Sequence, residues 1–200
     1  MILCVAGKMA SGKNQASRFL EKHNCISIDA DTIAHRAMKK KETEILKTFL
    51  PFARSKKIDL IKNDNTIDRR ALGKLLFSNK KLLQMQENIL YPEIEKLMFE
   101  FIFENKNANI VLNATLLYKT PRLMNLCEKI IYIDCPVLLR FIRAKKRDAL
   151  SSIEICKRFA TQVFLEREYK KTKIPMIKIH NNSSVIALEK KIDALAKTIF

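Results

Sequence analysis

The sequence predicts an α/β protein in which helices flank a five-stranded parallel sheet. Short apolar runs of strand length alternate with stretches whose apolar residues recur at helical spacing. Strands that alternate with helices in this way form parallel sheets with right-handed crossovers. Two glycines and a lysine follow the first run at the spacing of a phosphate-binding loop, which favours the same fold class. The predicted strands are Met1–Ala6, Cys25–Ile28, Asn109–Leu112, Lys129–Asp134 and Met176–Ile179.

The segment from Gly7 to Asn14 reads G-x-x-x-x-G-K-N and lies between a predicted strand and a predicted helix. Gly7 and Gly12 let the backbone turn sharply and approach an anion without a Cβ in the way. The loop N–H groups and the helix dipole then favour a phosphate. Lys13 can reach the β- and γ-phosphates of a nucleotide. The sequence therefore predicts a phosphate-binding loop (P-loop), with Asn14 where the pattern has Ser or Thr.

A pair of aspartates follows the second predicted strand. Asp29 and Asp31 lie at its carboxyl end, which is where ligands bind in open α/β sheets. Carboxylates there can serve magnesium or accept a proton from a substrate hydroxyl. One of them can instead cap the next predicted helix, Thr32–Met38. We expect Asp29 to be partly structural and Asp31 to be the chemical residue.

Length and composition indicate one globular domain over residues 1–200, of which 48% are hydrophobic. No apolar run approaches the roughly 20 residues that span a membrane, so we expect no membrane association. The five cysteines lack C-x-x-C spacing, and several lie in strand-like runs. This pattern predicts buried, reduced thiols and a cytoplasmic location.

The chain is strongly basic, with a formal net charge of +17. Such an excess attracts polyanions, including nucleic acid and anionic nucleotide substrates. The basic residues are spread along the chain, however, and no basic tail or aromatic-basic RNA motif is present. We therefore favour a lysine-rich solvated surface over nucleic-acid binding.

Residues 42–105 show helical patterns without a clear strand. Asp68 begins one predicted helix, and Asn79 can cap another. Tyr91 and Pro92 are expected to interrupt that second helix, because the residue before proline avoids the helical region. Pro92 then suits the first turn of a further helix. The stretch is too long for a simple crossover, so we expect a helical insertion that binds the substrate.

Basic residues gather in the predicted helix Val137–Lys146. Arg140, Arg143 and Arg147 are spaced three and four apart, which places them on one helix face. Arginine forks match phosphate oxygens, so a mobile helical lid carrying them over the P-loop would neutralise a phosphoryl group in transfer. A solvated charged face is the alternative, and both interpretations stay open.

The expected lid covers about residues 140–169. Ser151 and Glu154 have the spacing of a capping box, which predicts the start of the second lid helix. That helix is expected to continue to about Tyr169. The last predicted helix follows the fifth strand, over Val185–Ile199.

At these residues the sequence resembles the dephospho-CoA kinase family, whose members are P-loop kinases of the nucleoside-monophosphate-kinase type. The resemblance covers Ile2 to about Leu195. The aspartate segment is similar to the family's I-D-A-D-x-I-A, and two further segments are similar to its I-D-R-x-x-L-G and L-H-P-x-I. Lid positions and a late asparagine match as well. The matching segments are Ile28–Arg36, Ile67–Phe77, Leu90–Ile94, Arg143 with Arg147 and Asp148, Arg158 with Gln162, and Ile179–Asn182.

The resemblance implies Mg²⁺-assisted transfer of the ATP γ-phosphoryl to the ribose 3′-hydroxyl of dephospho-CoA, the last step of coenzyme A biosynthesis. Asp31 would be the catalytic base and Lys13 would hold the phosphates. The implied metal ligand is Asn14. The implied acceptor-binding residues are Asp31, Arg36, Asp68 and Arg69. The implied ATP-binding residues are Gly7, Ala10, Ser11, Gly12, Lys13, Asn14, Gln15, Arg143, Arg147 and Asn181.

Three positions depart from the family pattern. Asn14 replaces the metal-binding hydroxyl, Asn113–Lys119 stands where the family has D-x-P-L-L-F-E, and Arg140 replaces a usual glutamine. Another small-molecule or nucleotide P-loop kinase remains open as an alternative, because a P-loop alone does not define the acceptor. A nucleic-acid-binding protein with a degenerate P-loop is the second alternative. The sequence is compatible with a monomer or a homo-oligomer.

Overall fold

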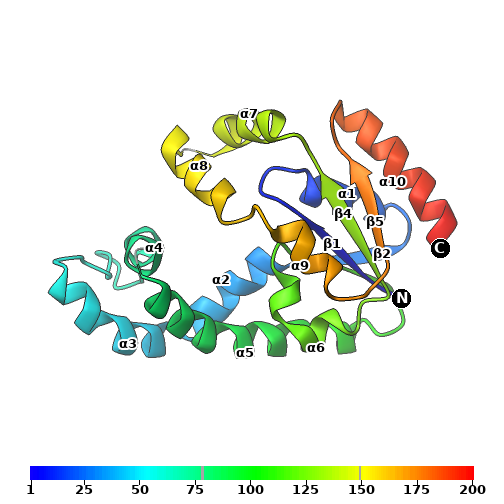
Figure 1. Cartoon of the computed structure of the whole chain (residues 1–200). Helices are drawn as coiled ribbons and strands as arrows, with labels where there is room; N and C mark the ends of the chain where they lie inside the picture. Colours follow the sequence, from blue (N-terminus) through cyan, green and yellow to red (C-terminus); the bar gives the residue numbers. More distant parts are fainter. Residues whose placement is uncertain (78, 149) are drawn as a thin grey trace. The chain divides into compact units, whose positions relative to one another are not determined.

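The computed structural model describes residues 1–77, 79–148 and 150–200 (Figure 1). Within these residues, five strands form one parallel sheet in the order β2-β3-β1-β4-β5. All five predicted strands are present, each within one residue of its expected ends. Their bounds are β1 Ile2–Gly7, β2 Cys25–Asp29, β3 Asn109–Asn113, β4 Lys129–Asp134 and β5 Met176–His180.

The chain forms two compact units. The first contains Met1–Ala30 and Phe99–Phe200, and it carries the whole sheet. The second contains Asp31–Met98 and is helical, and it overlaps the insertion expected over about residues 42–105. The predicted P-loop and lid therefore belong to the first unit, and the predicted acceptor-binding residues belong to the second.

The first unit is built on strands that are apolar on both faces, as expected of buried parallel strands. Side chains of β1, β3 and β4 on one face pack against α1 and α10, with Leu20 and Ile192 fully buried between them. Helix α1 begins at Lys13, after the loop that follows β1. The helices of this unit are α1 Lys13–Glu21, η1 Leu117–Lys119, α6 Pro121–Met124, α7 Val137–Arg147, α8 Ser152–Ala160, α9 Leu165–Lys170 and α10 Val185–Ile199.

The second unit has its own apolar core, in which Ile45, Phe49 and Leu75 are fully buried. Its described residues contain an isolated antiparallel bridge between Ile61 and Ile67 rather than a strand, as the sequence predicts. No helix in the described parts of either unit is long and apolar enough to cross a membrane. The helices here are α2 Ala30–Lys40, α3 Glu42–Ser55, α4 Arg69–Phe77 and α5 Lys80–Glu104, the first and last of which extend beyond the unit.

Two predicted helix boundaries are wrong. Pro92 does not interrupt the helix, because α5 continues through it. Leu82 is buried before the proline and Leu97 is buried after it. Burial on both sides outweighs the loss of one backbone hydrogen bond at the proline. The predicted single helix after Ser151 is instead two helices, α8 and α9. The break begins at Thr161, whose hydroxyl bonds a backbone carbonyl of α8.

The predicted helix starts are confirmed where a side chain caps them. Asn79 Oδ1 accepts from the backbone N–H groups at the start of α5, and Ser151 forms a complete capping box with Glu154. Asp68 Oδ1 accepts from the N–H groups of Arg70 at 2.8 Å and Ala71 at 3.0 Å. These caps satisfy N–H groups that have no partner inside their own helices.

The cap at Asp68 predicts a pH-dependent contribution to stability. Hydrogen bonds from the N–H groups of Ala71 and Arg70 lower the pKa of Asp68 below its ordinary value of 3.8. A carboxylate with a lowered folded-state pKa stabilises the fold above its unfolded pKa, and that stabilisation is lost as the pH falls below 3.8. Asp68→Asn should therefore unfold at lower urea than the wild type at neutral pH, and this deficit should shrink when the pH is lowered well below 3.8. An equal deficit at both pH values would contradict a role for the charge.

Candidate active site

The P-loop joins the end of β1 to the start of α1 and has the backbone that its glycines allow. Gly7 has a φ of +152° and Gly12 a φ of +103°, values that side chains with a Cβ rarely adopt. A Cβ on Gly7 would collide with the carbonyl oxygen of Ile133, and one on Gly12 with the side-chain amide of Asn181. Lys13 follows as the first residue of α1. The two glycines are therefore required both by conformation and by close packing.

Asn181 lies outside the P-loop in the sequence and forms a hydrogen bond with a P-loop residue. Its side chain donates to the carbonyl of Ser11 at 2.8 Å, and its backbone N–H donates to the carbonyl of Asp134 at 2.7 Å. The residue is buried and follows β5 directly. The structure therefore gives Asn181, which the sequence assigns to ATP binding, a contact with the loop itself.

A hydrogen-bonded cluster joins Asn14, Asp29 and Asn113 at the carboxyl ends of β2 and β3. Asp29 Oδ2 accepts from Asn14 Nδ2 at 3.0 Å and from Asn113 Nδ2 at 3.1 Å. Asn113 Nδ2 also donates to Asn14 Oδ1 at 3.1 Å. Because a carboxylate only accepts, both amides must turn their NH₂ groups toward Asp29. The two departures from the family pattern at Asn14 and Asn113 are therefore in direct contact.

The donor set of this cluster fits a magnesium ion that is bound chiefly by other ligands. Asn113 is only 4% exposed, and its Oδ1 has no hydrogen-bond partner. A neutral amide oxygen is a hard donor of the kind that Mg²⁺ accepts directly or through water. Nowhere in residues 1–77, 79–148 and 150–200 do three His, Cys, Asp or Glu side chains gather as a metal site. An ion here would depend on nucleotide phosphates and water for most of its ligands.

Tyr169 forms hydrogen bonds with the backbone of the segment that follows Asn113. This tyrosine is fully buried on α9, and its Oη accepts from the N–H of Leu117 at 3.1 Å. The same hydroxyl lies 3.2 Å from the carbonyl oxygens of Ala114 and Thr115. Burial raises the pKa of Tyr169, so the hydroxyl keeps its proton as a donor. Sequence patterns gave no signal for this contact, since its partners are backbone atoms.

The three arginines of α7 that the sequence assigns to a lid have different environments. Arg143 donates to Cys135 Sγ at 3.3 Å and to the carbonyl of Ser183 at 3.2 Å, whereas Arg147 is exposed and pairs with Asp148 at 2.9 Å. Arg140 is 4% exposed. The predicted alternative of one solvated charged face is therefore wrong for Arg140. The sequence placed Arg140 in the expected lid but did not predict its burial.

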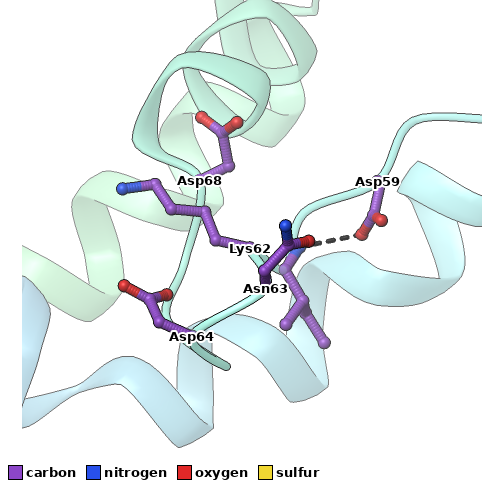
Figure 2. Close-up of a pocket in the computed structure, with 6 residues that line it drawn as sticks. Asp59, Lys62, Asn63, Asp64 and Asp68 are labelled. Carbon is purple, nitrogen blue, oxygen red and sulfur yellow. Dashed lines mark hydrogen bonds between the residues drawn. The ribbon is translucent and has the colours of Figure 1, made fainter.

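The residues that the sequence assigns to the acceptor lie in the second unit. Asp31 is in the first turn of α2 and Arg36 is on the same helix. Asp68 and Arg69 stand at the start of α4, beside two hollows of about 510 and 390 Å³ that share Lys62 and Asp68. The larger hollow, shown in Figure 2, is lined by Asp59, Ile61, Lys62, Asn63, Asp64 and Asp68.

The charge of the larger hollow disfavours a polyanion at its centre, because three of its six lining residues are aspartates. Asp68 also uses its carboxylate to cap α4. Arg69 and Arg70 line the smaller hollow with Lys62, which gives that hollow more cations than carboxylates. On charge alone, an anionic group is therefore favoured more in the smaller hollow than in the larger one.

The parallel sheet has β1 at its centre, and β1 leads through a glycine loop to a lysine at the start of α1. This arrangement defines a P-loop nucleotide-binding protein. The sequence profile of the dephospho-CoA kinase family matches residues 1–187. The chain belongs to the dephospho-CoA kinase family. A dephospho-CoA kinase of Treponema denticola is 36% identical over 196 residues, which cover 96% of this chain and 87% of that protein. One of Treponema pallidum is 32% identical over 97% of this chain and 93% of that protein.

Solved structures match the fold. A dephospho-CoA kinase from Campylobacter jejuni has a TM-score of 0.71 and 28% identity, covering 99% of this chain and 96% of that one. A Thermus thermophilus protein has a TM-score of 0.80 at 24% identity, and the match covers 100% of this chain and 98% of that one. A shikimate kinase from Bacteroides thetaiotaomicron has a TM-score of 0.51 at 16% identity, and the match covers 100% of this chain and 98% of that one. At this identity the likeness supports the fold and nothing about function. The predicted fold class and family are confirmed.

Proposed function

We propose that this chain transfers the γ-phosphoryl group of ATP to the ribose 3′-hydroxyl of dephospho-CoA, giving CoA and ADP. The observation that carries the proposal is the family match over residues 1–187, together with a P-loop of the required backbone. The described cysteines are all free, which supports a reducing, cytoplasmic location.

Each part of the site then has a role in the transfer. Loop N–H groups and Lys13 bind the phosphates, and Asp31 accepts the proton of the acceptor hydroxyl. The hydroxyl oxygen forms a bond to the γ-phosphorus as the bond to the β-phosphate oxygen breaks, and ADP carries the leaving charge. Alignment and electrostatic stabilisation supply most of the rate enhancement in such a reaction.

Mg²⁺ bound to ATP would neutralise charge on the transferring phosphates. Asn14 and Asn113 are the residues that would contact the ion or its water, since their amide oxygens lie in the cluster with Asp29. Asn14 Oδ1 already accepts a hydrogen bond from Asn113, so we propose that ATP and water supply most of the ligands.

The identity of Asn14 predicts a raised magnesium requirement. At saturating ATP, Asn14→Ser and Asn14→Thr should reach half-maximal turnover at less Mg²⁺ than the wild type, because a hydroxyl binds the ion more closely. Titration of MgCl₂ in an ADP-release assay measures this. If both substitutions abolish activity, Asn14 has a role that a hydroxyl does not fill. Turnover that persists in excess EDTA would remove the metal from the mechanism.

The cluster also predicts how stability responds to charge at residue 113. Asn113→Asp would place a second carboxylate where an amide now donates to Asp29 Oδ2 at 3.1 Å. We expect the free energy of unfolding to fall by about 2 kcal/mol without metal, because a buried acceptor loses its donor. Added Mg²⁺ should raise the melting temperature of this variant more than that of the wild type. Equal shifts in the two proteins would contradict placement of the ion at this cluster.

A coupled ADP assay tests the proposed function directly. ADP release should depend on dephospho-CoA, and mass spectrometry should show CoA as the product. AMP, CMP and adenosine are the competing acceptors to include. Equal or greater turnover with any of them would overturn the assignment of dephospho-CoA.

A further inference from the structure

Met9, the third residue of the P-loop, is held at both of its backbone polar groups by side chains from the lid region. Its N–H donates to Gln162 Oε1 at 2.6 Å, and its carbonyl accepts from Arg140 Nε at 2.8 Å. Arg140 belongs to α7, and Gln162 follows α8. Two elements far from the loop in sequence therefore contact the two backbone polar groups of the same residue.

Arg140 also packs on an aromatic ring of α8. Its guanidinium carbon lies 4.0 Å from the ring centroid of Phe159, at cation–π distance. Phe159 and Gln162 are close in sequence, so Arg140 bridges α7, the end of α8 and the loop. We call Arg140, Phe159 and Gln162 the Met9 clasp.

Burying the charge of Arg140 costs desolvation free energy, which an ion-pair partner would offset. Only 4% of the residue is exposed, and its Nη2 has no hydrogen-bond partner. Among the residues that the structure describes, no carboxylate forms an ion pair with it. Burial lowers the pKa of the Arg140 guanidinium, which reflects the same desolvation. A buried cation without a carboxylate partner, one hydrogen bond from a phosphate-binding loop, is suited to stabilising an anion bound in that loop.

We propose that Arg140 is a positioning residue for ATP, which fixes Met9 through the clasp and adds an uncompensated positive charge beside the loop. This inference rests on the proposed function in assigning ATP as the anion. A P-loop binds phosphate through several N–H groups that must converge on one point. Fixing Met9 in advance lowers the conformational entropy that ATP binding must remove.

Two substitutions at Arg140 separate its donor from its charge. Arg140→Met removes both, and Arg140→Gln keeps an N–H donor for the Met9 carbonyl but no charge. The matched control is Arg122→Met on α6, because Arg122 also lies over an aromatic ring, 5.2 Å from the centroid of Phe99, and is exposed. Readouts are KM and kcat for ATP, ATP affinity by calorimetry, and hydrogen–deuterium exchange of the peptide containing Met9 in the nucleotide-free protein.

We expect Arg140→Met to raise the KM and Kd for ATP roughly tenfold, the equivalent of about 1.4 kcal/mol, with a smaller change in kcat. Exchange at the Met9 peptide should accelerate. Arg140→Gln should restore slow exchange without restoring ATP affinity, and Arg122→Met should change neither. Gln162→Leu should also accelerate exchange, and its effect combined with Arg140→Met should be less than additive, since both act on one residue.

The proposal is overturned if Arg140→Met matches Arg122→Met in both ATP affinity and exchange. A lower melting temperature with unaltered ATP affinity and exchange would also overturn it, because Arg140 would then only fill the core. Full ATP affinity in Arg140→Gln would overturn the role of the charge. If Arg140→Met does not fold, the ATP affinity of Arg140→Gln and the exchange at the Met9 peptide in Gln162→Leu test the proposal instead. Absence of ADP formation by the wild type would count against the proposed function, whereas exchange and calorimetry would still decide the clasp.

Discussion

Replacing Lys13 with methionine is expected to lower turnover by roughly 10²- to 10³-fold, the scale for losing one charge-stabilising group in a transition state. Lys13 is the first residue of α1 and follows Gly12, whose φ of +103° sets the loop backbone. Methionine keeps an unbranched side chain of similar length but removes the ammonium group that would balance charge moving from the γ- to the β-phosphate. Initial rates at saturating ATP and dephospho-CoA measure the effect.

Lys22→Met is the matched control for this prediction. Lys22 lies at the other end of α1, where it pairs with Glu189 of α10 and is largely exposed. Its loss should leave turnover close to that of the wild type. If Lys13→Met and Lys22→Met have similar turnover, Lys13 does not act on the phosphates.

Asp31→Asn is expected to lower turnover by roughly 10²-fold or more while ATP affinity stays unchanged, because asparagine does not accept the proton of the acceptor hydroxyl. Calorimetry with ATP and rapid-quench measurement of product formation separate binding from chemistry. Asp31 lies in the first turn of α2, so a carboxamide at this position still suits the helix start.

Asp29→Asn provides the comparison for Asp31. Asp29 accepts hydrogen bonds from Asn14 and Asn113, so its replacement should lower the melting temperature as well as activity. Near-normal turnover in Asp31→Asn, with a loss of activity but not of stability in Asp29→Asn, would move the general base to Asp29.

The sheet could be predicted from sequence because its strands are buried on both faces and read as continuous apolar runs. The P-loop could be predicted because its residues are consecutive and its glycines are required by backbone conformation. The interruption expected at Pro92 was wrong for a physical reason. Local preference decides a helix boundary only where tertiary packing does not, and α5 is buried on both sides of the proline.

The contacts around the P-loop were beyond sequence analysis because they join distant residues through backbone atoms or amides. Asn14 and Asn113 are separated by 99 positions, and no local pattern indicates that they share Asp29. Arg140 reaches Met9 across 131 positions. A side chain that bonds a backbone carbonyl leaves no complementary residue in the sequence to identify the partner.

The position of Asn181 has a consequence for the order in which the protein acquires its activity during synthesis. The P-loop is complete in sequence by residue 14, but the side chain that closes it follows β5, 170 positions after Ser11. Asn181 is itself fixed by the carbonyl of Asp134 at the end of β4. A nascent chain that has not yet delivered Asn181 from the ribosome lacks this contact. The P-loop therefore gains this contact only after residue 181 of the 200 has been translated.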